Sequence, residues 1–332
     1  MPVFNHTEEL KVMLDSILEN TYQDWELLAI DDGSGKETIN VLQRYEEQDG
    51  RIHLIQRDRL PKGAPTCRNI GMDRAKGEFL IFFDSDDYIA PYCLEQRVRE
   101  IKAHPELDFI VFRNGTYIEG IFQKHASKCN FGYPIYQDDI AAFCARTLPF
   151  VVVNNIYRHA SLIKSHITWD SNLLSLQDAQ FNLECLVSNM KYKYSSCPPD
   201  YGYRIETQGS ISKKIMSQEH FNSNIYATEC FYKLIQNKFG TKYDHSLYRG
   251  AMFIYVKISR TGFQTAFNKR LANTISLFSK FWGSLFRFQI FLTYIFSKIM
   301  PLTPARRIPI LNYLIWYRNW GKWVVHKQKG LS

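Results

Sequence analysis

Residues 77–87 constrain the fold more than any other stretch, because a run of apolar residues passes directly into a cluster of acids. The segment reads Gly-Glu-Phe-Leu-Ile-Phe-Phe-Asp-Ser-Asp-Asp. A continuous apolar run of this length is typical of the central strand of a parallel sheet, and ligands gather at the carboxyl ends of such strands. We therefore expect Asp84, Asp86 and Asp87 to lie at a ligand site.

These acids indicate a cation as well as a polar ligand. Three carboxylates within four residues repel one another unless a cation, or a donor such as a ribose hydroxyl, lies between them. Oxygen ligands favour Mg²⁺ or Mn²⁺, and Mg²⁺ usually takes one or two protein carboxylates and completes its shell with water and substrate phosphates. The pattern favours a nucleoside diphosphate. The alternative is an Asp-rich turn that caps the helix after Pro91.

Strand-like and helix-like segments alternate through residue 103. This alternation predicts an α/β fold, with a doubly wound, mixed and mostly parallel sheet flanked by helices. A second strand, residues 26–30, also runs into acids at Asp31 and Asp32. Between residues 114 and 210 the alternation breaks, and we expect this part to build the second wall of the ligand crevice.

Residues 1–5 are typical of the end of a strand whose apolar beginning is missing, so we expect the first strand to be truncated before Pro2. Asn5, with Glu8 three residues later, predicts the N-cap of the first helix. Asp178 stands where a loop meets a predicted helix over residues 178–190. A carboxylate there suits proton transfer, but it is also an ordinary N-cap.

The charge of the chain is unevenly distributed. The net charge is +8, yet the last acidic residue is Asp244, and fourteen lysines and arginines follow it. Residues 216–332 are predicted to be helical, basic and rich in aromatic residues, with a second amphipathic piece over residues 308–325. Such a region favours in-plane association with an anionic membrane surface. The alternatives are a helical subdomain packed on the core, a surface for a partner protein, or nucleic-acid binding, for which no module is present.

Seven cysteines form an odd set without C-x-x-C spacing, which argues against a disulfide framework and against a zinc site. A reducing cytoplasm fits this composition. The nine histidines are scattered without the spacing of metal ligands, so we expect ordinary surface or core roles for them.

Four ordered motifs together resemble glycosyltransferase family 2, over roughly residues 2–210. They are Pro2-Val3-Phe4-Asn5, Asp31-Asp32-Gly33-Ser34, Arg68-Asn69-Ile70-Gly71 followed by Ala75-Lys76-Gly77-Glu78, and Asp84-Ser85-Asp86-Asp87. The resemblance implies a GT-A fold, a nucleotide-sugar donor, a divalent metal and inversion at the anomeric carbon. It departs from the family pattern at Val153, Asn155 and Gln177, which leaves the acceptor less defined than the donor.

The resemblance also implies roles for individual residues. By motif position, Asp32, Phe4 and Arg68 would contact the nucleotide. Asp84 and Asp86 match a D-x-D element that, with Asp87, would hold ribose and metal, and the metal is assigned to Asp86 and Asp87. Gln177-Asp178 resembles the acidic pair whose second member is the general base. The later segments Tyr203-Arg204 and Gly209-Ser210-Ile211-Ser212 resemble a part of the family that closes over the donor.

The sequence thus predicts an inverting glycosyltransferase domain over residues 1–215 and a membrane-associating region over residues 216–332. The expected donor is a UDP-sugar, and the expected acceptor is a lipid-linked or polysaccharide glycan of the bacterial surface, at the inner face of the membrane. Two other functions stay open: a non-catalytic binder of sugar nucleotides or glycans, and a nucleotidyltransferase. The latter should carry a Gly-rich basic phosphate loop near its start, and none is evident.

Overall fold

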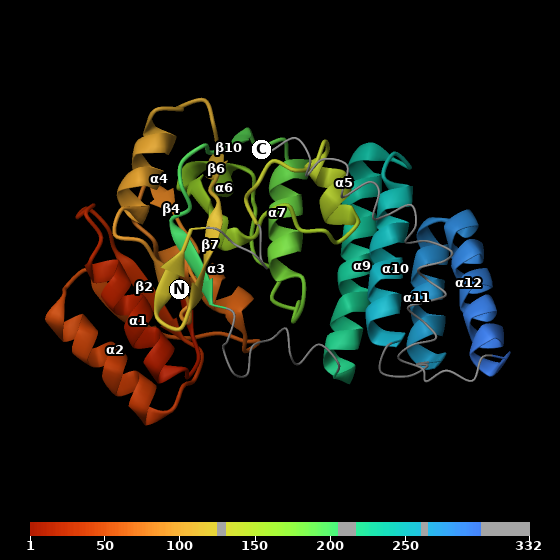
Figure 1. The fold of residues 1–332 in the computed structure, drawn as a ribbon, viewed down its shortest axis with the longest axis horizontal. Coiled ribbons are helices and arrows are strands. Elements are labelled where there is room, and N and C mark those ends of the chain that lie inside the picture. Colours follow the sequence, from red (N-terminus) through yellow and green to blue (C-terminus); the bar gives the residue numbers. More distant parts are fainter. Residues whose placement is uncertain (125–130, 205–216, 260–264, 300–332) are drawn as a thin grey trace. The chain divides into compact units, whose positions relative to one another are not determined.

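The computed structural model describes residues 1–124, 131–204, 217–259 and 265–299 (Figure 1). The chain divides into two compact units. The first comprises Met1–Pro134 and Leu148–Ser210, and the second comprises Ile135–Thr147 and Ile211–Ser332. The predicted domain boundary at residues 215 and 216 lies outside the described residues.

The first unit opens with a parallel three-stranded sheet in the order β1-β2-β3. Its strands and the helices among them are β1 (Pro2–Val3), α1 (Thr7–Leu18), β2 (Leu27–Asp31), α2 (Lys36–Gln48), β3 (Ile52–Gln56) and α3 (Ala64–Arg74). Strands β1 and β2 end in register, because Val3 pairs with Asp31. The predicted alternation of strands and helices is confirmed here, and it delivers the acids after β2 to one edge of the sheet.

A second, four-stranded sheet has the order β10-β6-β9-β4. Its elements are β4 (Phe79–Leu80), β6 (Phe109–Val111), β9 (Asn155–Arg158) and β10 (Tyr192–Tyr194), with α4 (Cys93–Lys102) packed nearby. Ile110, Phe112 and Ile156 form an apolar cluster with Val98 and Ile101 of α4.

The predicted central strand is shorter in the structure than its apolar run, and it is not central. Only Phe79 and Leu80 are in strand β4, and this strand lies at the edge of the order, paired antiparallel with β9. The apolar residues after it are held by side-chain packing instead. The Phe82 ring meets the rings of Tyr157, Trp169 and Phe181 edge-on.

A third sheet has the order β5-β11-β7-β8. Its strands are β5 (Tyr88–Ile89), β7 (Asn114–Ile118), β8 (Ile121–Gln123) and β11 (Tyr201–Arg204). Next to it, Arg97 and Asp200 form an ion pair at 2.6 Å, and both side chains are fully buried. The remaining elements of this unit are η1 (Val152–Asn154), α6 (His159–Lys164) and α7 (Gln177–Val187). The described strands make four parallel and four antiparallel pairs: the first sheet is parallel, and the second and third sheets are mixed.

The second unit is helical in its described parts, as predicted. Its helices are α5 (Asp139–Cys144), α9 (Gln218–Phe239), α10 (Asp244–Ser259), α11 (Thr265–Phe278) and α12 (Lys280–Ile299). Its core is aromatic: Tyr232 stacks on Phe278 at 5.0 Å, and Tyr248 packs on Trp282 at 4.6 Å between ring centroids. Within the described residues, no helix is long and apolar enough to cross a membrane. The predicted amphipathic piece at residues 308–325 lies outside the described part.

Candidate active site

Helix α3 positions the centre of the site through two neighbouring side chains. The Asn69 side chain makes two hydrogen bonds with the Trp169 backbone, donating to its carbonyl oxygen and accepting from its amide, each at 2.8 Å. This pair holds the Trp169 ring, which stacks on Phe181 at 4.3 Å. The Arg68 guanidinium lies over the same indole, 4.4 Å from its centroid. The ring and the helix together therefore fix the direction of a buried arginine.

Arg68 joins two of the predicted acids. Its Nη2 atom lies 2.7 Å from Asp84 Oδ1, while its Nη1 atom lies 3.5 Å from Asp178 Oδ1 and 3.3 Å from Gln177 Oε1. Burial opposes the positive charge on Arg68, but the carboxylates of Asp84 and Asp178 outweigh it and raise the pKa of the guanidinium. The D-x-D element and the predicted base thus share one cation, although 94 residues separate them in sequence.

Asp178 lies in the first turn of α7 rather than at its N-cap. The N-cap is Leu176, which makes no side-chain cap hydrogen bond, so the interpretation of Asp178 as a capping residue is wrong. Burial raises the pKa of Asp178 to about 6; the Arg68 charge opposes this shift, and the Asp84 charge adds to it. The side chain still exposes 26% of its surface. A carboxylate that titrates near 6 and meets solvent can accept a proton at neutral pH.

Asp87 is turned inward, away from solvent. One oxygen accepts from the Tyr201 hydroxyl, and the other accepts from the Arg204 backbone amide at 2.6 Å. Burial raises the pKa of Asp87 well above its usual range, and the charges of Asp86 and Asp84 act in the same direction. Asp87 therefore ties the D-x-D turn to strand β11, and its two carboxylate oxygens already have protein partners.

The Arg204 side chain fastens the same turn from the other side. Its Nε atom donates to the Asp86 carbonyl oxygen at 2.6 Å, and its guanidinium lies 4.7 Å from the centroid of the Tyr117 ring. Among the residues that the structure describes, its buried Nη2 atom has no hydrogen-bond partner. Such an atom is costly unless it meets an acceptor. The predicted closing segment, Gly209-Ser210-Ile211-Ser212, lies outside the described residues.

Asp31 and Asp32, at the end of β2, have different roles. The Asp31 carboxylate accepts from the backbone amides of Gly33 at 3.0 Å and Ser34 at 3.1 Å, which closes a turn. Gly33 has φ +88°, a conformation that L side chains rarely adopt, so glycine is needed at this turn. Asp31 is a structural residue, and it leaves the neighbouring Asp32 to face the next loop.

Asp32 is held by the loop that precedes α3. Its Oδ1 atom accepts from Arg57 Nε at 2.7 Å and from the Gly63 amide at 3.2 Å. The Cys67 thiol also contacts this carboxylate, and burial raises the pKa of that thiol to about 12. Cys67 and Arg68 are neighbours on α3. This helix therefore connects Asp32, which contacts Cys67, to Asp84 and Asp178, which contact Arg68. Three of the predicted acids, Asp32, Asp84 and Asp178, are thus connected through α3.

Phe4 is an exposed ring at the end of β1, with 42% of its surface accessible. Lys62 Nζ lies 3.5 Å from its centroid, a cation–π contact between two loops. Asn5 does not cap α1 as predicted. The N-cap is His6, and Asn5 Oδ1 instead accepts from the Gly35 amide at 3.0 Å, because the backbone at Asn5 has turned toward the loop after β2.

Two of the acids after β4 are accessible to a divalent metal. Asp84 exposes 38% of its side chain and Asp86 is half-buried, so both can reach a ligand. Among the residues that the structure describes, three or more His, Cys, Asp or Glu side chains nowhere gather around a common metal position. Mg²⁺ needs only one or two carboxylates when phosphates and water complete its shell. The residues thus fit a metal that arrives with a diphosphate. The alternative that the acids cap the next helix is wrong, since its N-cap is Tyr92 without a side-chain bond.

Three residues of the site were not predicted. Trp169 supports Arg68, Arg57 binds Asp32, and Lys62 contacts Phe4. Lys62 carried a weak signal, because it precedes a glycine and a helix start, where phosphates often bind. Trp169 carried none, since it lies 101 residues from Arg68 in sequence.

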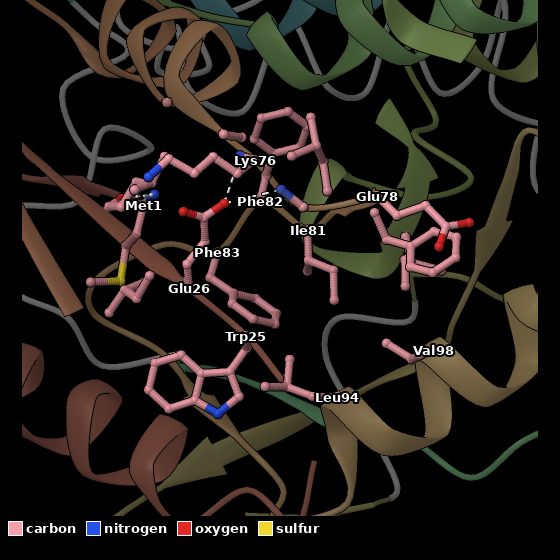
Figure 2. Close-up of a pocket in the computed structure, with 18 of the residues that line it drawn as sticks. Met1, Trp25, Glu26, Lys76, Glu78, Ile81, Phe82, Phe83, Leu94 and Val98 are labelled. Carbon is pink, nitrogen blue, oxygen red and sulfur yellow. Dashed lines mark hydrogen bonds between the residues drawn. The ribbon is translucent and has the colours of Figure 1, made fainter. Parts of the chain in front are cut away.

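A separate cavity of about 430 Å³ is lined by Trp25, Glu26 and Phe83, among other residues (Figure 2). Residues of β2, β4 and α4 line it, mostly with apolar side chains. At its rim the Glu26 carboxylate accepts from the backbone amides of Lys76 at 2.6 Å and Gly77 at 3.0 Å. Arg68 lines this cavity, whereas Asp32, Asp84 and Asp178 do not. The cavity therefore lies beside β2 and β4 and is not lined by the carboxylates of Asp32, Asp84 and Asp178.

Several relatives share sequence with the chain. An uncharacterized glycosyltransferase of Haemophilus influenzae is 37% identical over 98 residues, which cover 30% of this chain and 39% of the relative. The poly(ribitol-phosphate) beta-N-acetylglucosaminyltransferase TarP of Staphylococcus aureus is 27% identical over 237 residues, 68% of this chain and 67% of the relative. The chain thus spans well under half of the first relative's length and about two thirds of the second's.

Solved structures share the fold. The crystal structure of S. aureus TarS 1-349 in complex with UDP-GlcNAc matches with a TM-score of 0.63 at 18% identity, covering 99% of this chain and 90% of that one. The α/β architecture with added C-terminal helices is thereby confirmed. Residues 1–166 match the family described as "Glycosyl transferase family 2". Because this match covers half of its 332 residues, the chain belongs to glycosyl transferase family 2.

Proposed function

We propose that the protein transfers a sugar from a UDP-sugar to a glycan acceptor, with inversion at the anomeric carbon. One observation carries this proposal: Arg68 holds Asp84 of the D-x-D element and Asp178 of α7 at a single guanidinium. Donor-binding and proton-accepting groups therefore lie within reach of one substrate. A non-catalytic binder needs the first group but not the second, and a carboxyl pKa raised to about 6 has no role in binding alone.

The donor half of the site is proposed to bind the nucleotide. Phe4 offers an exposed ring on which a base can stack, and Asp32 offers an acceptor for a base or ribose donor. Lys62, which lies over the Phe4 ring, and Arg68, which pairs with Asp84, supply the positive charge that a diphosphate needs for neutralisation. Diphosphate oxygens at Arg68 would compete with its present carboxylate partners.

Asp178 is proposed as the general base. In a single displacement, the acceptor oxygen forms its bond to the anomeric carbon as the bond to the departing diphosphate breaks. The acceptor hydroxyl loses its proton in that step, and Asp178 takes it at Oδ1 or Oδ2. Arg68 keeps the base ionised near neutral pH, because its charge lowers the pKa that burial has raised.

Asp86 is proposed as the main carboxylate toward Mg²⁺ or Mn²⁺, with Asp84 beside it at the ribose or metal. A bound divalent ion supplies charge neutralisation for the leaving diphosphate. Asp87, the other carboxylate assigned to the metal from the sequence, is proposed to act through the turn that it holds between Tyr201 and Arg204.

The acceptor is proposed to be a lipid-linked or polymeric glycan of the bacterial surface, in keeping with the poly(ribitol-phosphate) transferases among the relatives. We place the reaction at the cytoplasmic face of the membrane. Six cysteines of the described residues are free thiols, which is usual for proteins of a reducing compartment.

The base is tested by Asp178→Asn, which keeps the shape of the side chain but cannot accept the proton. Transfer, measured as UDP release with membrane extract as acceptor, should fall by about 10²–10⁴-fold. UDP affinity, measured by calorimetry, should not fall, because Asp178 competes with the diphosphate for Arg68. Asp73→Asn is the matched control, because Asp73 is an exposed acid of α3 with Arg59 as its ion-pair partner. Undiminished turnover of the Asp178→Asn protein would show that Asp178 is not the base. If the unmutated protein binds UDP but releases none from any UDP-sugar, the non-catalytic binder of sugar nucleotides is favoured.

The metal is tested by UDP titration with and without Mn²⁺. The unmutated protein should bind UDP more tightly with Mn²⁺, and Asp86→Asn should lose most of this gain, because one ligand is removed. Asp58→Asn, an exposed acid paired with Arg74, serves as the control. Equal UDP affinity of the unmutated protein in both buffers would contradict a metal in donor binding.

A further inference from the structure

Helix α12 carries a stripe of exposed aromatic side chains. Phe281 exposes 69% of its surface, and Phe288 and Phe291 each expose 56%. These residues and Ser284 follow helical spacing, so they lie along one side of the helix. Three large apolar rings in a row on the surface are unusual for a solvent-facing helix. They indicate a surface that binds something apolar.

The inner side of α12 is packed, which fixes the stripe as its outer side. Phe286 is fully buried, and a Cβ atom on Gly283 would lie 2.7 Å from the Ser276 Cα atom of α11. The two helices are therefore in close backbone contact, side by side in Figure 1. The last turn of α11 adds Leu277, which is 77% exposed, to the outer surface.

Basic side chains border the aromatic stripe. Lys280 and Arg287 are exposed on α12, next in sequence to the exposed rings of Phe281 and Phe288. Arg287 donates to Asn273 Oδ1 at 2.9 Å, so its guanidinium lies where the two helices meet. The sequence beyond Asp244 has no acidic residue to balance these charges. We call the outer side of α11 and α12, with Leu277, Lys280, Phe281, Arg287, Phe288 and Phe291, the aromatic-basic face.

We propose that the aromatic-basic face lies in the headgroup region of an anionic lipid membrane. Exposed rings bordered by cations on a helix that cannot span a bilayer are what in-plane binding requires. The rings enter the boundary between headgroups and acyl chains, while the long basic side chains reach the phosphates. A second copy of the chain would bring the same positive charges together, so charge favours the lipid. This inference rests on the peripheral location proposed above, but not on the transfer chemistry.

The proposal is tested by flotation of the full chain with vesicles of phosphatidylglycerol and phosphatidylcholine in equal parts. Phe281→Ser and Phe288→Ser should each lower the vesicle partition coefficient about tenfold, because each removes a ring from the apolar boundary. Lys280→Gln should lower it about fivefold on these vesicles and have little effect on pure phosphatidylcholine. Ile163→Ser is the matched control, since Ile163 of α6 is 61% exposed outside this face.

UDP binding, measured by calorimetry on each variant, keeps this test separate from the donor site. Retained UDP affinity with lost flotation supports the aromatic-basic face, whatever the transfer assays give. Undiminished flotation of the double variant Phe281→Ser with Phe288→Ser would overturn it. Equal binding of the unmutated protein to neutral and anionic vesicles would also overturn the proposal. So would a protein that does not bind vesicles but self-associates in sedimentation, if the same substitutions abolish that self-association.

Discussion

A single guanidinium links the chemistry of this site at the scale of residues. Arg68 is 5% exposed and is held by an indole on one side and two carboxylates on the other. A buried cation of this kind is stable only with close anionic partners. Its charge also sets how easily Asp178 ionises, because burial and Arg68 act on that carboxyl in opposite directions.

The opposite effects of burial and of Arg68 on the pKa of Asp178 predict that the rate of transfer depends on pH. A base must be deprotonated to act, so kcat/KM for transfer should rise with pH through about 6, the raised pKa of Asp178, and level off above it. Arg68→Met should move this rise to higher pH, because it removes the charge that lowers the pKa. The measurement is a kcat/KM profile across pH, with Arg59→Met, a surface arginine, as control. A rise at the same pH in both variants would show that Arg68 does not tune the base.

At the scale of elements, two close contacts decide how helices are placed. Asn69 of α3 makes its reciprocal bonds to the Trp169 backbone, and this ties the helix to a loop 100 residues away. In the second unit, Gly283 lets α12 approach α11. Neither contact follows from helix propensity, since glycine weakens an isolated helix.

The Gly283 contact gives a stability prediction. Gly283→Ala should destabilise the protein by about 1–3 kcal/mol, although alanine favours helices, because the added Cβ meets the Ser276 side chain and backbone. Urea unfolding followed by circular dichroism measures the change. Gly50→Ala is the control, since a Cβ at Gly50 meets nothing within 4 Å. A stabilised Gly283→Ala protein would mean that the helices are not in contact there.

At the scale of the whole molecule, the chain has two compact units, and all of the predicted donor and base residues belong to the first. The second contains the aromatic-basic face. Each unit has its own buried core, as a domain requires, with Ile110 and Phe112 in the first and Phe231 and Tyr248 in the second. Ligand binding at the donor site should therefore be detected as stabilisation of the first unit.

Calorimetric unfolding checks this expectation. UDP with Mn²⁺ at a hundredfold excess over Kd should add about 2.7 kcal/mol to the free energy of unfolding of the first unit, and so raise its Tm by about 5–10 °C. ADP with Mn²⁺ is the control for nucleotide specificity. An unchanged thermogram with UDP would contradict a UDP site in this unit.

The sequence by itself determined the fold class and predicted which acids would form the site, because period, composition and motif order are local properties of the chain. It could not determine which acids share a partner. That Arg68 would meet Asp84 and Asp178, that Asp87 would turn inward to Tyr201, and that Trp169 would support the arginine were decided by tertiary packing. Contacts across about a hundred residues depend on how the sheets and helices assemble, and a buried charge accepts whichever opposite charge that assembly brings within reach.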